Sequence, residues 1–152
     1  MQDADSAVPL ANALVAGGLP VIEITLRTEA ALPAMSKIAA ANSGALTLLA
    51  GTVTTPEQVK QAVDAGAQAI VSPGLNVRVV EHCLKHAIAV LPGVCTPTEI
   101  EAARNYGLSC LKFFPAEAYG GVKTLKALAD VYSQFDFMPT GGVNAQNLAE
   151  YL

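Results

Sequence analysis

The chain has 152 residues, a formal net charge of −4 and 52% hydrophobic residues, so we expect one domain with a single core over residues 1–152. Its three arginines, Arg27, Arg78 and Arg104, are scattered, so the sequence offers no basic patch for a nucleic acid. It shows neither a secretory signal pattern nor an apolar stretch near the roughly 20 residues that cross a bilayer, so we expect no membrane partner.

Cysteine and histidine spacing argues against a disulfide framework and against a metal site. Cys83, Cys95 and Cys110 are odd in number and lack the C-x-x-C spacing of thiolate zinc ligands. His82 and His86 have the i, i+4 spacing that can hold a metal, but no third ligand is evident in the sequence. We therefore expect a protein of the reducing cytoplasm that binds no metal.

Short apolar strands and amphipathic helices alternate along the chain. The periodicity predicts a helix over residues 4–16, a strand over 21–27 and a helix over 28–42. Five further strands are expected at residues 45–50, 67–72, 87–92, 110–115 and 135–140. Because parallel strands need long crossovers and are covered by helices, this order predicts an α/β protein with a parallel sheet.

Two of the later helices carry clear start and stop signals. Thr55 and Thr96 each precede a proline and stand three residues before a Gln or Glu, which is the pattern of a capping box. Gly66 and Gly107 suit the left-handed position that ends a helix.

Turn signals recur at the carboxyl ends of the expected strands. They are Gly51-Thr52, Ser72-Pro73-Gly74, Pro92-Gly93, Pro115 and Pro139-Thr140-Gly141-Gly142. This recurrence is typical of a β/α barrel, and the lack of a glycine-rich nucleotide fingerprint after the first strand disfavours a doubly wound sheet. A closed barrel has eight strands, so the six expected here indicate an open sheet or missing strands.

Lys112 lies inside an apolar strand, between Leu111 and Phe113. A strand lysine commonly extends to solvent. If Lys112 points inward instead, the loss of water favours the neutral amine, which can attack a carbonyl and form a Schiff base.

The strand over residues 21–27 places Glu23, Thr25 and Arg27 on one face by alternation. Either this face meets water at a sheet edge, or it looks into a barrel, where Glu23 could move protons.

The segment Thr140-Gly141-Gly142 offers backbone amides that an anion can approach closely, because glycine has no side chain in the way. A phosphate would suit this segment, although a Gly-Gly pair is more often only a turn.

Six segments together resemble the family of 2-keto-3-deoxy-6-phosphogluconate (KDPG) aldolases, also called 4-hydroxy-2-oxoglutarate (KHG) aldolases. They are EITLRTEAAL, LAGTVTTPEQV, AGAQAIVSPG, LPGVCTPTE, YGLSCLKFFPAEAYGGVK and FMPTGGVNAQN. The resemblance covers almost the whole chain, and KFFPAE with PTGG at this separation is specific. It implies a (β/α)₈ TIM barrel, a homotrimer, and a class I aldolase that needs no metal or other cofactor.

The implied reaction is reversible cleavage of the phosphorylated keto sugar acid KDPG to pyruvate and glyceraldehyde 3-phosphate. Cleavage of 4-hydroxy-2-oxoglutarate to pyruvate and glyoxylate is also implied. By position, Lys112 would form the Schiff base and Glu23 would act as general acid and base. The implied substrate-binding residues are Arg27 and Thr52 for the pyruvate carboxylate, Pro73 for the pyruvate end, Phe114 and Thr140 beside the reacting centre, and Gly141 and Gly142 for the phosphate.

The sequence departs from the family in two places. Leu49 stands where the family motif before Thr52 usually begins with glycine, a change in packing near the carboxylate site. The family's first strand, and its eighth strand with Gly-Gly-Ser, have no counterpart here, so we expect a barrel of about six strands that lacks one contiguous wedge. Two alternatives stay open: a non-catalytic truncated barrel module, and an aldolase for the 6-phosphogalactonate analogue.

Overall fold

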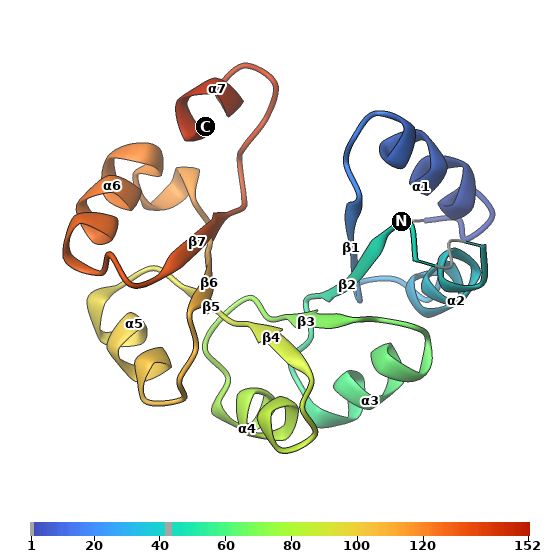
Figure 1. Cartoon of the computed structure of the whole chain (residues 1–152), viewed down its shortest axis with the longest axis horizontal. Helices are drawn as coiled ribbons and strands as arrows, with labels where there is room; N and C mark the ends of the chain where they lie inside the picture. Colours follow the sequence, from blue (N-terminus) through green and yellow to red (C-terminus); the bar gives the residue numbers. More distant parts are fainter. Residues whose placement is uncertain (1, 42–43) are drawn as a thin grey trace. The chain divides into compact units, whose positions relative to one another are not determined.

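The computed structural model describes residues 2–41 and 44–152, which form two compact units. Unit 1 comprises Met1–Val71 and Val77–Val90, and unit 2 comprises Ser72–Asn76 and Leu91–Leu152. Each unit has parallel strands with helices packed beside them (Figure 1). The α/β class with parallel strands is therefore confirmed, while a single domain over residues 1–152 stays a prediction.

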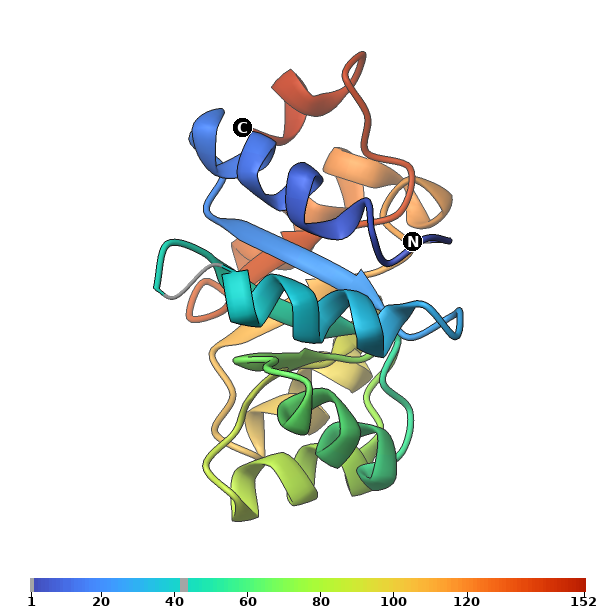
Figure 2. The same cartoon turned by 90° about the vertical axis from the view of Figure 1, so that its right-hand side faces the viewer.

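The first sheet has the strand order β1-β2-β3-β4, and its pairs β1 with β2 and β2 with β3 are parallel. Its strands are β1 (Val21–Thr25), β2 (Thr47–Gly51), β3 (Ala69–Val71) and β4 (Ala89–Leu91). Its helices are α1 (Ala7–Ala16), α2 (Ala31–Ala41), α3 (Pro56–Asp64) and α4 (Val77–Lys85). Helices α1 and α2 pack side by side and contact β1 (Figure 2).

The core of unit 1 follows from the alternation predicted for the first strand. Ile22 and Ile24 are buried, whereas Glu23 and Thr25 on the other face are half-buried. The predicted strand over 21–27 ends at Thr25, and the predicted helix over 28–42 begins only at Ala31. Its predicted end at residue 42 lies outside the described residues.

The second sheet has the order β5-β6-β7 and is parallel throughout. Its strands are β5 (Gly93–Val94), β6 (Cys110–Phe113) and β7 (Asp136–Pro139). The other elements of unit 2 are α5 (Pro97–Arg104), the 3₁₀ helix η1 (Glu117–Tyr119), α6 (Gly121–Val131) and α7 (Leu148–Tyr151). A core cluster fills the space between helices and sheet; it consists of Val94, Ile100, Ala103, Leu111, Phe113, Ala116, Leu128 and Phe135.

The predicted helix signals are confirmed. Thr55 and Thr96 both form complete capping boxes at the starts of α3 and α5. Gly66 and Gly107, with φ of +99° and +68°, follow the ends of these helices in the left-handed region. These caps set where each helix begins and ends relative to the strands beside it.

The turn expected at Pro92-Gly93 is wrong, because Gly93 opens the short strand β5. Proline has no amide to donate to the strand ladder, which fits the break between β4 and β5 at Pro92. Residue 93 must be glycine for lack of space, since a Cβ there would lie 2.1 Å from the carbonyl oxygen of Pro73.

Among the described residues no helix is long and apolar enough to cross a membrane.

Candidate active-site residues

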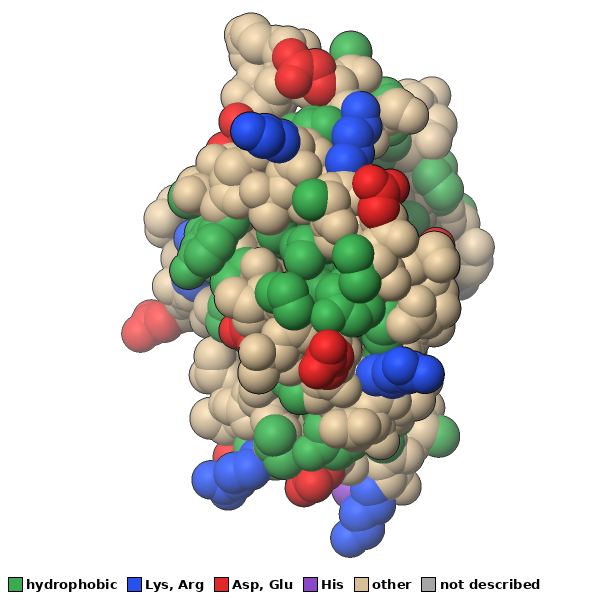
Figure 3. All heavy atoms as spheres, turned by 90° about the vertical axis from the view of Figure 1, so that its left-hand side faces the viewer, with side chains coloured by type: hydrophobic (Ala, Val, Ile, Leu, Met, Phe, Trp, Pro, Cys, Tyr) green, Lys and Arg blue, Asp and Glu red, His purple; other side chains and the backbone are tan. Residues whose placement is uncertain are grey.

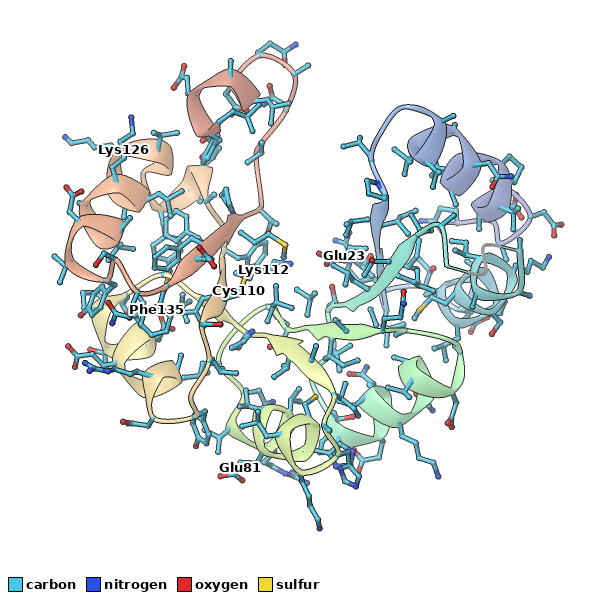
Figure 4. The ribbon with its side chains drawn as sticks, viewed as in Figure 1. Glu23, Glu81, Cys110, Lys112, Lys126 and Phe135 are labelled. Atoms are coloured by element: carbon cyan, nitrogen blue, oxygen red, sulfur yellow. The ribbon has the colours of Figure 1, made fainter. Side chains whose placement is uncertain are left out.

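Lys112 is buried on the face of β6 opposite the core of unit 2. Leu111 and Phe113 point into the core cluster, so alternation turns Lys112 to the other face. Its side chain extends from β6 away from helices α5 and α6 (Figure 4). Only 7% of Lys112 is exposed, so the side chain does not extend to solvent as most strand lysines do.

The Phe114 ring lies beside the amine of Lys112. The Lys112 Nζ lies 5.1 Å from the centre of this ring, within the range of a cation–π contact. The Lys112 backbone is fixed by its pairing with Gly93 and Met138, and its amide donates a hydrogen bond to Pro92 O at 2.9 Å. A rigid strand therefore positions the one buried cationic side chain among the described residues.

The segment after β6 is bound to the segment after β7. The amide of Ala116 donates to Thr140 O at 2.8 Å, and that of Glu117 donates to Gly141 O at 3.0 Å. A Cβ on Gly141 would lie 3.2 Å from two atoms of the Phe114 ring. The structure thus brings Lys112 and Phe114 together with Thr140 and Gly141, which belong to a later segment of the sequence.

Thr140 carries a buried hydroxyl that has no hydrogen-bond partner among the described residues. Buried polar atoms are almost always paired, so an unpaired one is expected mainly where a ligand or water completes the site. Its backbone is fully used, since Thr140 N donates to Phe113 O at 3.0 Å. The hydroxyl is therefore held in place and has capacity for a further hydrogen bond.

Gly141 and Gly142 have φ of +93° and +91°, which disfavours any other residue type at both positions. A Cβ on Gly142 would also lie 2.5 Å from Glu117 Cγ. The two amides donate none of the hydrogen bonds found among the described residues. The carbonyl oxygen of Gly142 accepts hydrogen bonds from the side-chain amides of Asn144 and Asn147, at 2.9 and 3.1 Å.

Asn144 lies in a local turn ahead of the last helix. Its side chain accepts the amide of Gln146 at 2.9 Å in a local turn, and α7 begins only at Leu148, with Asn147 before it. Asn side chains commonly close such turns by accepting an amide two residues on.

Pro73 is half-buried in a turn that contacts with Ser72 and Gly93 stabilise. The fully buried hydroxyl of Ser72 donates to Gly74 O at 2.8 Å. The contact with Gly93 described above fixes the Pro73 carbonyl from the other side. Neither Ser72 nor Gly93 was singled out from the sequence for this role.

In unit 1, Glu23 lies against the end of β2. It pairs with Leu49 in the parallel register, so its side chain shares a face with Gly51. A Cβ on Gly51 would lie 1.9 Å from Glu23 Oε1, so the carboxylate occupies the space that a larger residue would fill. Figure 4 shows Glu23 on the side of β1 away from α1.

Arg27 and Thr52 follow β1 and β2 in the same unit. Arg27 is exposed, and its Nε donates to Thr25 Oγ1 at 3.2 Å. Thr52 has φ of +59°, which is unfavourable for a β-branched residue and is found mainly where function requires it. This strain marks Thr52 independently of any sequence motif.

The geometry gives no support for a metal centre among the described residues, where no group of three His, Cys, Asp or Glu side chains is close enough to hold an ion. His82 and His86 lie with their rings 4.3 Å apart, and His86 Nδ1 is 2.8 Å from His82 O. That backbone contact occupies one ring nitrogen of His86.

The whole chain is similar to known proteins. A family model described as "Aldolase: KDPG and KHG aldolase" matches residues 1–152. The chain is 49% identical to the 2-dehydro-3-deoxy-phosphogluconate aldolase of Treponema pallidum, over 100% of the chain and 72% of that protein. It is 46% identical to the KHG/KDPG aldolase of Escherichia coli, over 97% of the chain and 69% of that protein.

Two solved structures have the same fold. The Zymomonas mobilis 2-keto-3-deoxy-6-phosphogluconate aldolase with 3-phosphoglycerate has a TM-score of 0.94 and 40% identity, covering 100% of the chain and 72% of that protein. The KDPG aldolase of Legionella pneumophila, with pyruvate captured as a covalent carbinolamine, has the same TM-score and identity, and 73% of it is covered.

Proposed function

The chain belongs to the KDPG and KHG aldolase family and is an aldolase, and we propose that Lys112 is its Schiff-base residue. The proposed reaction is the cleavage of KDPG to pyruvate and glyceraldehyde 3-phosphate, and of 4-hydroxy-2-oxoglutarate to pyruvate and glyoxylate. The observation that carries the assignment is the burial of Lys112 on the non-core face of β6. Lysine side chains are seldom buried, and a buried amine in an aldolase is the group expected to attack a carbonyl.

The chemistry of Lys112 follows from its amine. Its neutral form attacks the C2 carbonyl of the substrate and gives a carbinolamine, which loses water to form an iminium ion. The positive nitrogen then accepts the electron pair of the C3–C4 bond as that bond breaks, while the C4 hydroxyl proton goes to a base. The aldehyde leaves, the resulting enamine is protonated at C3, and water releases pyruvate and regenerates the lysine.

Glu23 is the proposed general acid and base for these proton transfers. It would protonate the departing hydroxyl of the carbinolamine, accept the C4 hydroxyl proton and return a proton to C3. The contact of its carboxylate with Gly51 supports this role, because it limits the positions that the side chain can take. A positioned carboxylate loses less freedom when it transfers a proton.

The remaining residues are proposed to hold the substrate. Arg27 and Thr52 would bind the pyruvate carboxylate, for which a guanidinium is well suited. The strained backbone of Thr52 supports its part in this. Pro73 would line the pyruvate end of the substrate.

Four residues of unit 2 are proposed to contact the substrate near its reacting centre and at its phosphate. The unpaired hydroxyl of Thr140 supports a hydrogen bond near the reacting centre, with the Phe114 ring packed beside it. The amides of Gly141 and Gly142 would bind the phosphate, and their lack of hydrogen bonds among the described residues supports this assignment.

We favour the gluconate-type substrate over its galactonate analogue. A relative named for the gluconate substrate is 49% identical to the chain. A solved structure described as native KDPGal is 32% identical. The two substrates differ in the stereochemistry at C4, so comparing their turnover rates tests this preference directly.

The proposed assembly is a homo-oligomer, a trimer as the family resemblance implies, located in the cytoplasm. Apolar side chains gather on the face that carries α5 and α6 (Figure 3). A groove there is lined by Pro97, Ala127, Val131 and Tyr132, among others, and Val131 is 70% exposed. Exposed apolar patches of this kind favour association, which light scattering of the purified chain would measure.

Trapping with pyruvate and sodium borohydride tests the central assignment. Borohydride reduces a Schiff base to a stable amine, so intact-mass spectrometry should show one reduced pyruvyl group, and peptide mapping should place it on Lys112. The Lys112→Met variant replaces the amine by an apolar side chain of similar length and should show no adduct. Lys126→Met, which changes an exposed lysine on α6 (Figure 4), should react like the unaltered chain. A folded chain that forms no adduct would support the non-catalytic alternative.

A further inference from the structure

Glu117 and Tyr151 form a hydrogen bond in unit 2 that no step of the proposed reaction uses. We propose that this pair positions the Gly141-Gly142 segment and thereby sets the affinity for phosphorylated substrates. The inference rests on the proposed function, because it assumes that these two glycines bind the phosphate. Both residues would act as positioning residues rather than as catalytic ones.

The backbone of Glu117 is joined directly to the glycine segment. Its amide donates to Gly141 O at 3.0 Å, beside the bond from Ala116 N to Thr140 O at 2.8 Å. These two bonds run from the segment after β6 to the segment after β7. A shift of the Glu117 backbone would therefore also shift Gly141, whereas Thr140 stays bonded to Ala116.

The side chain of Glu117 packs on Gly142 of this segment and on Gly121. A Cβ on Gly142 would lie 2.5 Å from Glu117 Cγ, and one on Gly121 would lie 2.8 Å from Glu117 Oε1. The stem of Glu117 thus covers Gly142, and its carboxylate covers Gly121. This close packing explains why two glycines face one glutamate, and it makes the position of Gly142 depend on the rotamer of Glu117.

Tyr151 is what fixes that rotamer. Its ring packs against the core cluster of unit 2, and its hydroxyl donates to Glu117 Oε1. The hydrogen bond to Glu117 raises the pKa of Tyr151 to about 12, because it favours the protonated form of the hydroxyl. Helix α7, which carries Tyr151, therefore joins the core to the segment that follows β6.

Without Tyr151, the exposed carboxylate of Glu117 would turn among several rotamers. Some of these rotamers would bring its negative charge nearer to the proposed phosphate site, where like charges repel. The packing on Gly142 would also loosen. Both effects weaken the binding of a phosphorylated substrate and leave the chemistry at Lys112 unaffected.

The test compares KDPG, which carries a phosphate, with 4-hydroxy-2-oxoglutarate, which does not. Tyr151→Phe should raise KM for KDPG about tenfold with kcat nearly unchanged, since removing uniform binding acts on KM. KM for 4-hydroxy-2-oxoglutarate should stay within about twofold, close to the error expected for independent sites. Glu117→Ala should raise KM for KDPG by a smaller factor, because it loosens the packing on Gly142 but also removes the negative charge. Glu117→Gln, whose Oε1 can still accept a hydrogen bond from the Tyr151 hydroxyl, should stay much closer to the unaltered chain.

Tyr132→Phe is a matched control, because it removes a hydrogen bond of 3.1 Å from another core-packed tyrosine to a carboxylate, that of Glu101. It should leave the ratio of the two KM values unchanged. Equal effects of Tyr151→Phe on both substrates, or no effect on either, would overturn the inference.

Failure of the proposed function would have a different signature. In that case the unaltered chain would form no pyruvate adduct on Lys112 and cleave neither substrate. The affinity for 3-phosphoglycerate, measured by calorimetry, would then test the inference without turnover. An unaltered chain that binds it and a Tyr151→Phe variant that binds it about tenfold more weakly would support the inference, and any other pair of results would overturn it.

Discussion

A methyl group added at Gly51 should disable Glu23 without unfolding the protein. The Cβ of Gly51→Ala would lie 1.9 Å from Glu23 Oε1, 2.6 Å from Cδ and 2.8 Å from Cγ. The carboxylate oxygen would have to move by about 1.5 Å to reach the 3.4 Å of an ordinary contact. All three atoms belong to the flexible side chain of Glu23 and none to the backbone, so the backbone of β1 and β2 can stay in place.

The expected effect on catalysis is large and the effect on stability is small. A displacement of about 1 Å can cost roughly 100-fold in rate, so kcat for KDPG cleavage should fall about 100-fold. An alanine in place of glycine restricts the unfolded chain, so the free energy of unfolding should change by less than about 1 kcal/mol. Glu23→Gln should lose at least as much activity, because it removes the titrating group.

Pyruvate release measured with lactate dehydrogenase gives kcat, and urea unfolding gives the stability. Gly17→Ala serves as the control, since its Cβ would meet nothing closer than 3.4 Å and its φ of −82° suits alanine. Full activity of Gly51→Ala together with an inactive Glu23→Gln would refute the positional reasoning. Full activity of both variants would refute the role of Glu23.

Three further predictions concern single side chains. Thr140→Val removes a buried hydroxyl without a partner among the described residues, so urea unfolding should show equal or higher stability while kcat/KM falls. Thr55→Ala removes the acceptor of the Gln58 amide, a bond of 3.2 Å, and should lower the free energy of unfolding by about 1 kcal/mol. Burial raises the pKa of the Cys83 thiol from 9.0 to about 11, so the folded chain keeps a proton that the unfolded chain releases. Stability should therefore fall as the pH rises from 9 to 11, and unfolding curves of Cys83→Ala should show a smaller fall over that window.

Much of this protein could be predicted from local sequence. Alternation placed Ile22 and Ile24 in a core and Glu23 on the opposite face, and the hydroxyl-proline pattern placed the starts of α3 and α5. These features depend on residues within one turn of helix or a few positions of a strand, so the sequence contains them directly. The motif around Lys112 indicated the family, which the comparisons confirm.

The tertiary structure decided what depends on contacts between distant segments. Burial of Lys112, rather than extension to solvent, follows from the packing around β6. The contact of Glu23 with Gly51 depends on the register of β1 and β2, and the close approach of Pro73 to Gly93 depends on where β5 begins. The hydrogen bond from Tyr151 to Glu117 joins residues 34 positions apart. Periodicity in the sequence tells which face a side chain occupies, but only the strand register and the path of the loops determine which atoms meet there.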